Sequence, residues 1–317
     1  MTQFTVGILD FGTRAQDEDP KTIVDRTLCL AQHAEALGYS HYWLAEHHSV
    51  ECCWASPEIV VALIARSTLR ISVGPAGLLL SAHNPLRIAC DFSLLEKLYP
   101  GRVDLGLARG IPKPNLLALT GWREGMDEAA LKAIFEEKLR ELLEYMPVAE
   151  QHQAIPHKPR AIPWPPKRPR IWVLGTGEVA MSLASRLGLN FAYSVLHMGM
   201  KVNPVVFEQF EQALLTQNGG ESPRCSLAVA GVCAESAERA SAMAKNRVDP
   251  GVYPLVVGTP IQCREILGEL SETFGVTSFT FLDLAHLFED RVESIRLLAQ
   301  AVNLSPIHAP IPQDAIT

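Results

Sequence analysis

The sequence predicts an α/β protein in which eight parallel strands, each followed by helical sequence, close into one barrel. Eight short apolar segments alternate with segments of helical periodicity along the chain. The composition does not change halfway, and 317 residues suit one barrel of roughly 250 residues with insertions. The 48% of hydrophobic residues supplies a sizeable core. We therefore expect one domain over residues 1–317 rather than two.

Composition also excludes several classes of protein. The formal net charge of −7 argues against a protein that mainly coats nucleic acid or an anionic membrane. No run reaches the ~18 apolar residues of a membrane span, and the first residues do not resemble a signal peptide. The seven cysteines include no Cys-x-x-Cys pair at zinc-like spacing, which indicates reduced thiols. We expect a cytoplasmic protein with no metal site and no nucleic-acid or membrane partner.

Local signals define the elements of the first half. Residues 20–37 repeat apolar side chains at helical spacing, and Gly38 ends this helix. Ser56 and Pro57 are typical of a helix start, with serine as N-cap and proline at the first helical position. The expected strands are residues 4–9, 41–45, 70–80 and 102–108, and the expected helices are residues 20–37, 57–67 and 86–98.

The second half continues this alternation, interrupted by insertions. Residues 109–126 form a loop before a long helix over residues 126–145. Seven prolines exclude a regular element from residues 147–169, which we expect to be an ordered insertion. A further insertion is expected at residues 248–258. The later strands are residues 171–174, 190–194, 226–233 and 277–282, and the later helices are residues 177–187, 204–217, 235–246, 260–274 and 286–302.

A barrel of this kind carries its catalytic residues at the carboxyl ends of its strands. The second strand is followed by Glu46, His47 and His48. Alternation places Trp43 and His47 on one face, with Glu46 and His48 on the other. Adjacent histidines that point apart chelate a metal poorly, whereas a single imidazole is a plausible general base. From the residues alone, a hydrogen-bonded structural histidine is the commoner role for His47.

Two more strand ends have unusual residues. The third apolar run contains Gly74, Pro75 and Gly77, and glycine inside a strand indicates a bulge or a close approach of backbone to a ligand. A kink that only closes the barrel explains these residues equally well. The fourth strand ends at Arg109, a residue suited to bind a phosphate or carboxylate, or to pair with a neighbouring acid.

A glycine-rich turn, Gly175-Thr176-Gly177, joins the fifth strand to the next helix. Backbone amides at a helix N-terminus favour an anion such as a phosphate, although such turns are common in α/β proteins. Residues 258–260 form a second turn, in which Thr259 could be only an N-cap. Arg109 and the first turn could hold one phosphate together.

Five segments of the chain form a set that extends beyond these strand ends. They are Trp43-Leu44-Ala45-Glu46-His47-His48, Ser56-Pro57, Val73-Gly74, Asn84-Pro85-Leu86-Arg87 and Tyr99-Pro100-Gly101-Arg102-Val103-Asp104-Leu105-Gly106. Together they resemble the bacterial-luciferase-like flavin-dependent monooxygenase superfamily. The similarity is dense over residues 4–110 and returns at residues 171–194 and 256–282, so it covers most of the chain.

This resemblance implies a TIM barrel that binds a flavin at the carboxyl ends of its strands. Family members use reduced FMN and dioxygen, whereas other branches use a deazaflavin that moves hydride without oxygen. His47 falls on the family's catalytic histidine, and Ala76 and Gly77 fall on a non-prolyl cis peptide that supports the flavin ring. Arg109 matches an arginine that contacts the flavin phosphate, with the turn Gly175-Thr176-Gly177 as the other phosphate contact.

The phosphate site departs from the family pattern. Thr176 is followed by Gly177 and, further on, Ala180, where members often present serine or threonine hydroxyls. A second phosphate arginine is not evident near Glu128, although Arg123 could substitute for it. These losses imply weak retention of flavin, so we expect reduced FMN to be supplied as a cosubstrate by a separate flavin reductase.

The leading hypothesis is a monooxygenase in which reduced FMN and dioxygen give a flavin peroxide that oxygenates a small organic substrate. One alternative is a deazaflavin-dependent hydride-transfer oxidoreductase. Another is a non-catalytic flavin-binding partner subunit, against which the presence of His47 counts. We also expect a homodimer, and a lid formed by residues 248–258, for which an ordinary long loop is the alternative.

The loops that would border the site leave the substrate open. Cys52, Cys53, Trp54 and Trp122 lie in them and indicate a partly apolar pocket, or else residues covered by the core or by a dimer contact.

Overall fold

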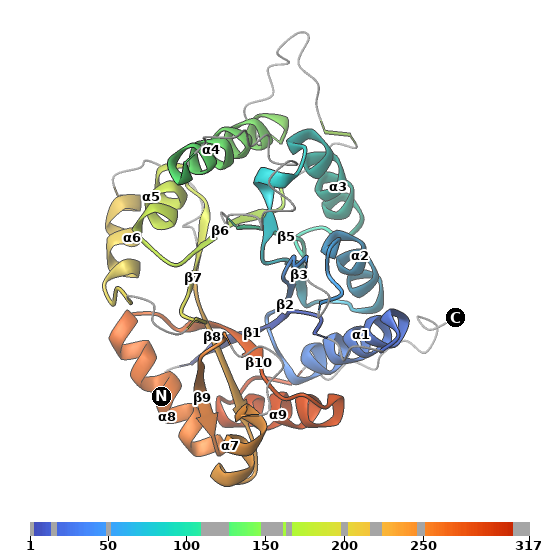
Figure 1. Ribbon diagram of the computed structural model, residues 1–317, viewed down its shortest axis with the longest axis vertical. Helices are drawn as coiled ribbons and strands as arrows, with labels where there is room; N and C mark the ends of the chain where they lie inside the picture. The colour runs from blue at the N-terminus through green and yellow to red at the C-terminus, as the bar shows by residue number, and fades with distance from the viewer. Residues whose placement is uncertain are drawn as a thin grey trace.

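The computed structural model is a barrel of parallel strands inside a ring of helices (Figure 1). It describes residues 3–13, 18–48, 52–108, 127–146, 161–162, 167–197, 202–215, 224–245 and 251–306. The expected insertion at residues 109–126 and most of the one at 147–169 lie outside these ranges. Among the described residues, no helix combines the length and apolarity needed to cross a membrane.

The strands pair in parallel around the barrel in the order β3-β2-β1-β10-β8-β7-β6-β5-β4. Their bounds are β1 Thr5–Asp10, β2 His41–Leu44, β3 Ser72–Pro75, β4 Leu78–Leu79, β5 Asp104–Ala108, β6 Arg170–Gly175, β7 Asn190–Ser194, β8 Cys225–Cys233, β9 Pro254–Gly258 and β10 Ser278–Asp283. Strands β3 and β4 are two parts of one barrel strand. A bridge between Val73 and Val103 joins β3 to the start of β5, which closes the barrel.

The helices cover the outside of the barrel and begin and end near the expected residues. Their bounds are α1 Pro20–Leu37, α2 Pro57–Ser67, η1 Leu80–Ala82, α3 Pro85–Leu98, α4 Glu128–Tyr145, α5 Glu178–Arg186, α6 Val206–Leu215, α7 Ala237–Lys245, α8 Pro260–Phe274 and α9 Phe288–Ala301. Gly38 ends α1 with φ 90°, a conformation that glycine adopts without strain. Thr259 caps α8 as a capping box with Gln262, whereas Ser56 precedes α2 without a side-chain cap bond.

Side-chain alternation divides the core into two parts. Residues such as Ile8, Leu44 and Val73 join a large cluster between the strands and the helices. Their neighbours Leu9 and Trp43 belong to a second cluster, which draws on inward-facing residues of most barrel strands. This second cluster is the interior of the barrel, and the ligand site is expected at its carboxyl-terminal end.

The expectation of a lid or long loop over residues 248–258 is wrong for residues 254–258. They form β9, which pairs in parallel with β8 outside the main ring, Val256 beside Gly231 and Val257 beside Val232. A Cβ on Gly231 would lie 1.8 Å from the Val256 carbonyl oxygen, so glycine at this position permits the pairing. Pro254 and Gly258 at the two ends of this segment are typical of a loop, but pairing with β8 makes the segment a strand. Residues 248–250 lie outside the described ranges.

Candidate active site

His47 lies at the mouth of the barrel, which we define as the end where the carboxyl ends of the strands meet. Its amide donates to the Trp54 carbonyl oxygen over 3.0 Å. Its ring packs edge-on against Phe11, with centroids 4.5 Å apart, and Nδ1 lies 3.5 Å from Sγ of Cys52. These contacts fix a half-buried imidazole that remains open to part of the mouth. Trp54 itself is buried in the outer core, which bears out the alternative reading of that residue.

The peptide bond between Ala76 and Gly77 is cis, as the family resemblance implies. It separates β3 from β4, and the Ala76 amide donates to the Leu44 carbonyl oxygen of β2 over 2.7 Å. A Cβ on Gly77 would lie 2.7 Å from the Ala108 amide nitrogen, so β5 passes too close for a side chain. The bulge is therefore built by close backbone packing next to β2, the strand that leads to His47.

Glu46 lies beside this bulge with a fully buried side chain. Its carboxylate accepts hydrogen bonds from Nε2 of His48 at 2.6 Å, from Nε2 of His83 at 3.0 Å and from the Leu79 amide at 2.7 Å. Burial would raise the pKa of Glu46, but these hydrogen bonds outweigh it and lower the pKa. Sequence reasoning only placed Glu46 on the face opposite His47 and did not find His83, which lies 37 residues away.

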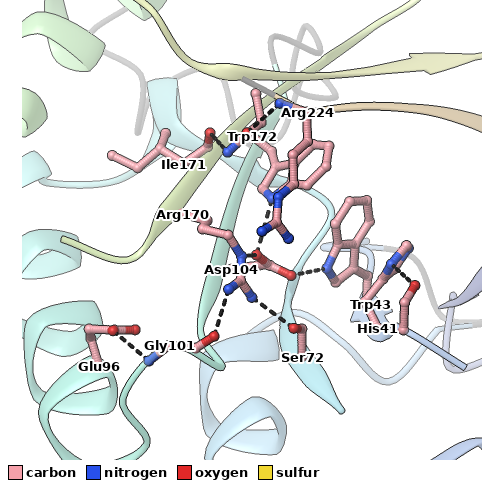
Figure 2. Close-up of polar contacts among 12 residues, drawn as sticks. His41, Trp43, Ser72, Glu96, Gly101, Asp104, Arg170, Ile171, Trp172 and Arg224 are labelled. Atoms are coloured by element: carbon pink, nitrogen blue, oxygen red, sulfur yellow. Dashed lines mark hydrogen bonds and ion pairs between the residues drawn. The ribbon is translucent and has the colours of Figure 1, made fainter. Parts of the chain in front are cut away.

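Two tryptophans fill the barrel axis below the mouth. The Trp43 and Trp172 rings pack edge-to-face with centroids 4.9 Å apart, and both indoles donate to Asp104, at 2.9 and 3.1 Å (Figure 2). Arg170 completes this set through Nε, 2.7 Å from the same carboxylate. Sequence reasoning singled out neither Asp104 nor Arg170 for a role. An aspartate in an apolar strand needs buried donors, and that requirement was the available signal.

The layer nearer the mouth includes several alanines. Ala45 follows Trp43 by two residues on the same face, and Ala76 stands two residues beyond Gly74, the partner of Trp43. Ala192 pairs with Leu174, which follows Trp172 by two residues. Alanine at these three positions fills less of the interior above the two tryptophans, the tryptophan floor, than a larger side chain would.

His41 lies on the other side of the tryptophan layer, toward the amino ends of the strands. Its Nε2 is 2.9 Å from Oγ1 of Thr280, and its ring stacks on Trp43 with centroids 4.0 Å apart (Figure 2). A Cβ on Gly7 would lie 2.1 Å from this ring, so glycine makes space for it. Burial is the main reason that the pKa of His41 falls to about 4. His41 is therefore neutral and structural near neutral pH.

The turn Gly175-Thr176-Gly177 lies at the mouth, between β6 and the start of α5. Thr176 is exposed, and a Cβ on Gly177 would meet nothing within 4 Å, so the turn is open to a ligand. Glu178 occupies the first turn of α5 and would oppose an anion there. Arg109 lies outside the described residues, so its pairing with this turn stays a prediction.

A second set of ionisable groups lies behind the mouth, between the barrel and α9. Asp10 accepts from the Tyr42 hydroxyl at 2.5 Å and lies 3.4 Å from the Arg291 guanidinium. Asp283 is buried nearby, and one of its carboxylate oxygens makes no hydrogen bond within the described part of the chain. Burial, opposed by Arg291, raises the pKa of Asp283 to about 6. Sequence reasoning did not find this set, because its members come from four separate elements.

Comparison with known proteins assigns this barrel to a class. A family model described as luciferase-like monooxygenase matches residues 4–250. The chain therefore belongs to the luciferase-like monooxygenase family. An uncharacterized protein of Bacillus subtilis (strain 168), YwcH, is 28% identical over 94% of this chain and 98% of its own length.

Two solved structures share the fold. One is the oxygenating constituent of 3,6-diketocamphane monooxygenase of Pseudomonas putida, a type II Baeyer–Villiger monooxygenase in complex with FMN. Its TM-score is 0.73 at 18% sequence identity, and the match covers 98% of this chain and 100% of that protein's chain. The other is an F420-dependent secondary alcohol dehydrogenase with an F420-acetone adduct; it has a TM-score of 0.71 and 13% identity, covering 95% and 99% of the two chains.

Proposed function

We propose that this protein is a monooxygenase that uses reduced FMN, supplied by a separate reductase, and dioxygen to oxygenate a small organic substrate. The observation that carries this proposal is the place of His47 at the mouth of a barrel of the luciferase-like family. The protein of P. putida with this fold binds FMN, which supports the choice of cofactor.

The described residues fit a flavin. Ala76 and Gly77 would support the ring system, because Ala76 lies in the barrel interior together with the small side chains of Ala45 and Ala192. Amides of the turn Gly175-Thr176-Gly177, together with Arg109, would hold the phosphate. Reduced FMN bound there supplies the electrons that activate dioxygen.

The protein's own groups would prepare the site around the cofactor. His47 is placed to hold or move a proton at its imidazole, since its unperturbed pKa lies near neutral pH. The Trp43 and Trp172 floor closes the barrel below, which keeps water from reaching the ring from that side. Phe11 and Cys52 give the wall beside His47 an apolar character that suits an uncharged substrate.

The proposed homodimer rests on a separate surface. Helices α2 and α3 are neighbours in the ring (Figure 1). Four apolar side chains on these two helices are exposed. They are Ile59, Leu63, Leu94 and Leu98, between 44% and 63% exposed. An apolar patch of this kind is typical of a subunit interface. Light scattering should show a dimer for the wild type and a monomer for Leu98→Glu; a wild-type monomer would refute the dimer.

The test of function is an anaerobic titration with reduced FMN followed by an oxygen pulse. The proposal requires flavin binding, oxygen consumption and, with a substrate, its oxygenation. Absence of oxygen consumption with candidate substrates would overturn it, and hydride exchange with a deazaflavin would favour the alternative. We expect His47→Ala to lower turnover while flavin affinity changes little, and Arg109→Ala to weaken flavin binding. Unchanged affinity in Arg109→Ala would remove that residue from the phosphate site.

A further inference from the structure

The carboxylate of Glu46 connects three parts of the chain at the mouth. It belongs to the segment that leaves β2 just before His47, and it accepts from the Leu79 amide in β4 at 2.7 Å. His83 follows η1 and donates to the same carboxylate at 3.0 Å. Because an ionised carboxylate only accepts hydrogen bonds, both imidazoles present Nε2–H to it. Leu79 stands two residues after the cis peptide. Glu46, the residue directly before His47, therefore connects the bulge to the segment that follows β2.

This tie extends to helix α4. Lys138 donates through Nζ to the His83 carbonyl oxygen at 2.9 Å and also to the Ser81 carbonyl oxygen, so η1 is held from outside the barrel. Glu58, in the first turn of α2, acts on His83 electrostatically. The charged groups that face the cluster are therefore Glu46 and His48 after β2, Glu58 on α2, His83 after η1 and Lys138 on α4.

We propose that Glu46, clamped by His48 and His83, is a positioning residue that holds β4, the strand after the cis peptide, at a fixed place relative to the segment that carries His47 and so sets how tightly the flavin binds. The second half of this statement rests on the proposed function, whereas the first half does not. Within the described part of the chain, no group of His, Cys, Asp or Glu is arranged to hold a metal ion. The contacts of Glu46 with His48, His83 and Leu79 are hydrogen bonds, and we call this set the clamp.

The clamp has a pH dependence with a definite sign. Burial lowers the pKa of His83, but the hydrogen bond and charge of Glu46, with the charge of Glu58, outweigh it and raise the pKa. Stabilisation by charged His83 is thus present at low pH and is lost as the pH rises through the raised pKa. Glu46, whose pKa is lowered, loses its contribution only as the pH falls through that value. The clamp is complete between these two pKa values and loosens on the alkaline side.

Hydrogen exchange of the flavin-free protein tests the clamp directly. The measured quantity is amide protection in a peptide covering residues 77–80, corrected for the intrinsic rate at each pH. We expect Glu46→Gln to lose protection about tenfold, since a hydrogen bond to a charged group is removed. His83→Gln keeps an N–H donor without a titrating charge, so it should be less protected than the wild type at pH 6 and equal to it at pH 9. The exposed α1 residue His33 provides the control, His33→Gln, which should match the wild type throughout.

Affinity for FMN provides the second readout. We expect about tenfold weaker binding in Glu46→Gln and, in the wild type but not in His83→Gln, a decline in affinity as the pH rises from 6 to 9. Protection in the Glu46→Gln variant within twofold of the wild type would overturn the clamp, and if that variant does not fold, a wild-type pH profile in His83→Gln would do the same. Lost protection with unchanged FMN affinity would overturn the link to flavin. If the wild type binds no FMN at all, the proposed function fails, and the exchange result still decides the clamp.

Discussion

Two buried carboxylates, Asp104 below the tryptophan floor and Glu46 at the mouth, each accept several hydrogen bonds, but from different kinds of donor. Asp104 accepts from Trp43, Trp172 and Arg170. Glu46 accepts from two imidazoles and one backbone amide. An indole and a guanidinium keep their hydrogens across the whole ordinary pH range, whereas an imidazole changes charge near neutral pH.

The difference shows how one barrel separates stability from function. Arg170 also donates to the Gly101 carbonyl oxygen and the Ser72 hydroxyl, so Asp104 sits in a network that links β3, β5 and β6 (Figure 2). This network lies at the amino ends of the strands, opposite the mouth, which we call the closed end of the barrel. Residues at this end of a TIM barrel contribute to stability rather than to catalysis. The cluster around Glu46 lies at the end that is expected to bind ligand, and one of its donors is His83, whose pKa is raised.

The largest expected effect comes from breaking the network at the closed end. Asp104→Asn leaves the largely buried Arg170 without its carboxylate and should lower the free energy of unfolding by about 3–5 kcal/mol. Because no donor in this network titrates near neutrality, the loss should be the same at pH 6 and pH 8, measured by denaturant titration. Glu136→Gln removes a more exposed partner of Arg186 and should cost within about 0.5 kcal/mol. A loss for Asp104→Asn that changes strongly over this pH range would break the comparison.

The next expected effect is an increase in stability, at the buried carboxylate of Asp283, which has too few hydrogen-bond and charge partners to offset its burial. Asp283 has a pKa raised to about 6, against an ordinary value near 3.9, so its ionisation costs the folded state up to about 3 kcal/mol. Its contribution to stability is fully present below the unfolded pKa and is lost as the pH rises through about 6. Asp283→Asn should therefore be more stable than the wild type at pH 8 and lose this advantage near pH 4.

Denaturant titrations at several pH values from 4 to 8 check this prediction. The measured quantity is the difference in unfolding free energy between Asp283→Asn and the wild type. A difference that stays constant over the range would show that Asp283 is compensated in the folded state, as Asp104 is.

The smallest effect on stability is expected at the turn Gly175-Thr176-Gly177. A Cβ on Gly177 meets nothing within 4 Å and the residue is extended, with φ −169°, so Gly177→Ala should change the unfolding free energy by less than about 1 kcal/mol. A Cβ on Gly175 would lie 2.3 Å from Cβ of Ala180, so Gly175→Ala should cost about 1–3 kcal/mol. Thermal unfolding compares the pair. Gly177→Ala should also weaken FMN binding if the turn holds the phosphate, and unchanged affinity would argue against that role.

Much of the fold could be predicted from local signals. Apolar runs, helix caps such as Gly38 and Thr259, and the alternation of strands with helices gave all eight barrel strands. The strand β9 was missed, because its pairing depends on the bare backbone of Gly231, far away along the chain. The cis peptide was anticipated through the family resemblance and not from the residues themselves.

The candidate site could be predicted only in part, for the same reason. His47 stands out because it follows a strand that must end at the mouth. Gly77 stands out as a glycine inside an apolar run, and Ala76 was indicated only by the family resemblance. His83, Asp104 and Asp283 do not stand out, since their importance lies in partners from other elements. Arg109 lies outside the described residues, and its role stays a prediction.

The sequence by itself determined the alternation of elements, the eight strands and the end of the barrel at which His47 stands, because periodicity and chain order are local properties. Only the tertiary structure decided which buried charges meet. Glu46 accepts from His83, and Asp104 accepts from Arg170. Sheet register and helix packing, rather than proximity along the chain, bring these donors to each buried carboxylate. The cost of leaving such a charge unpaired is what makes these long-range contacts decisive.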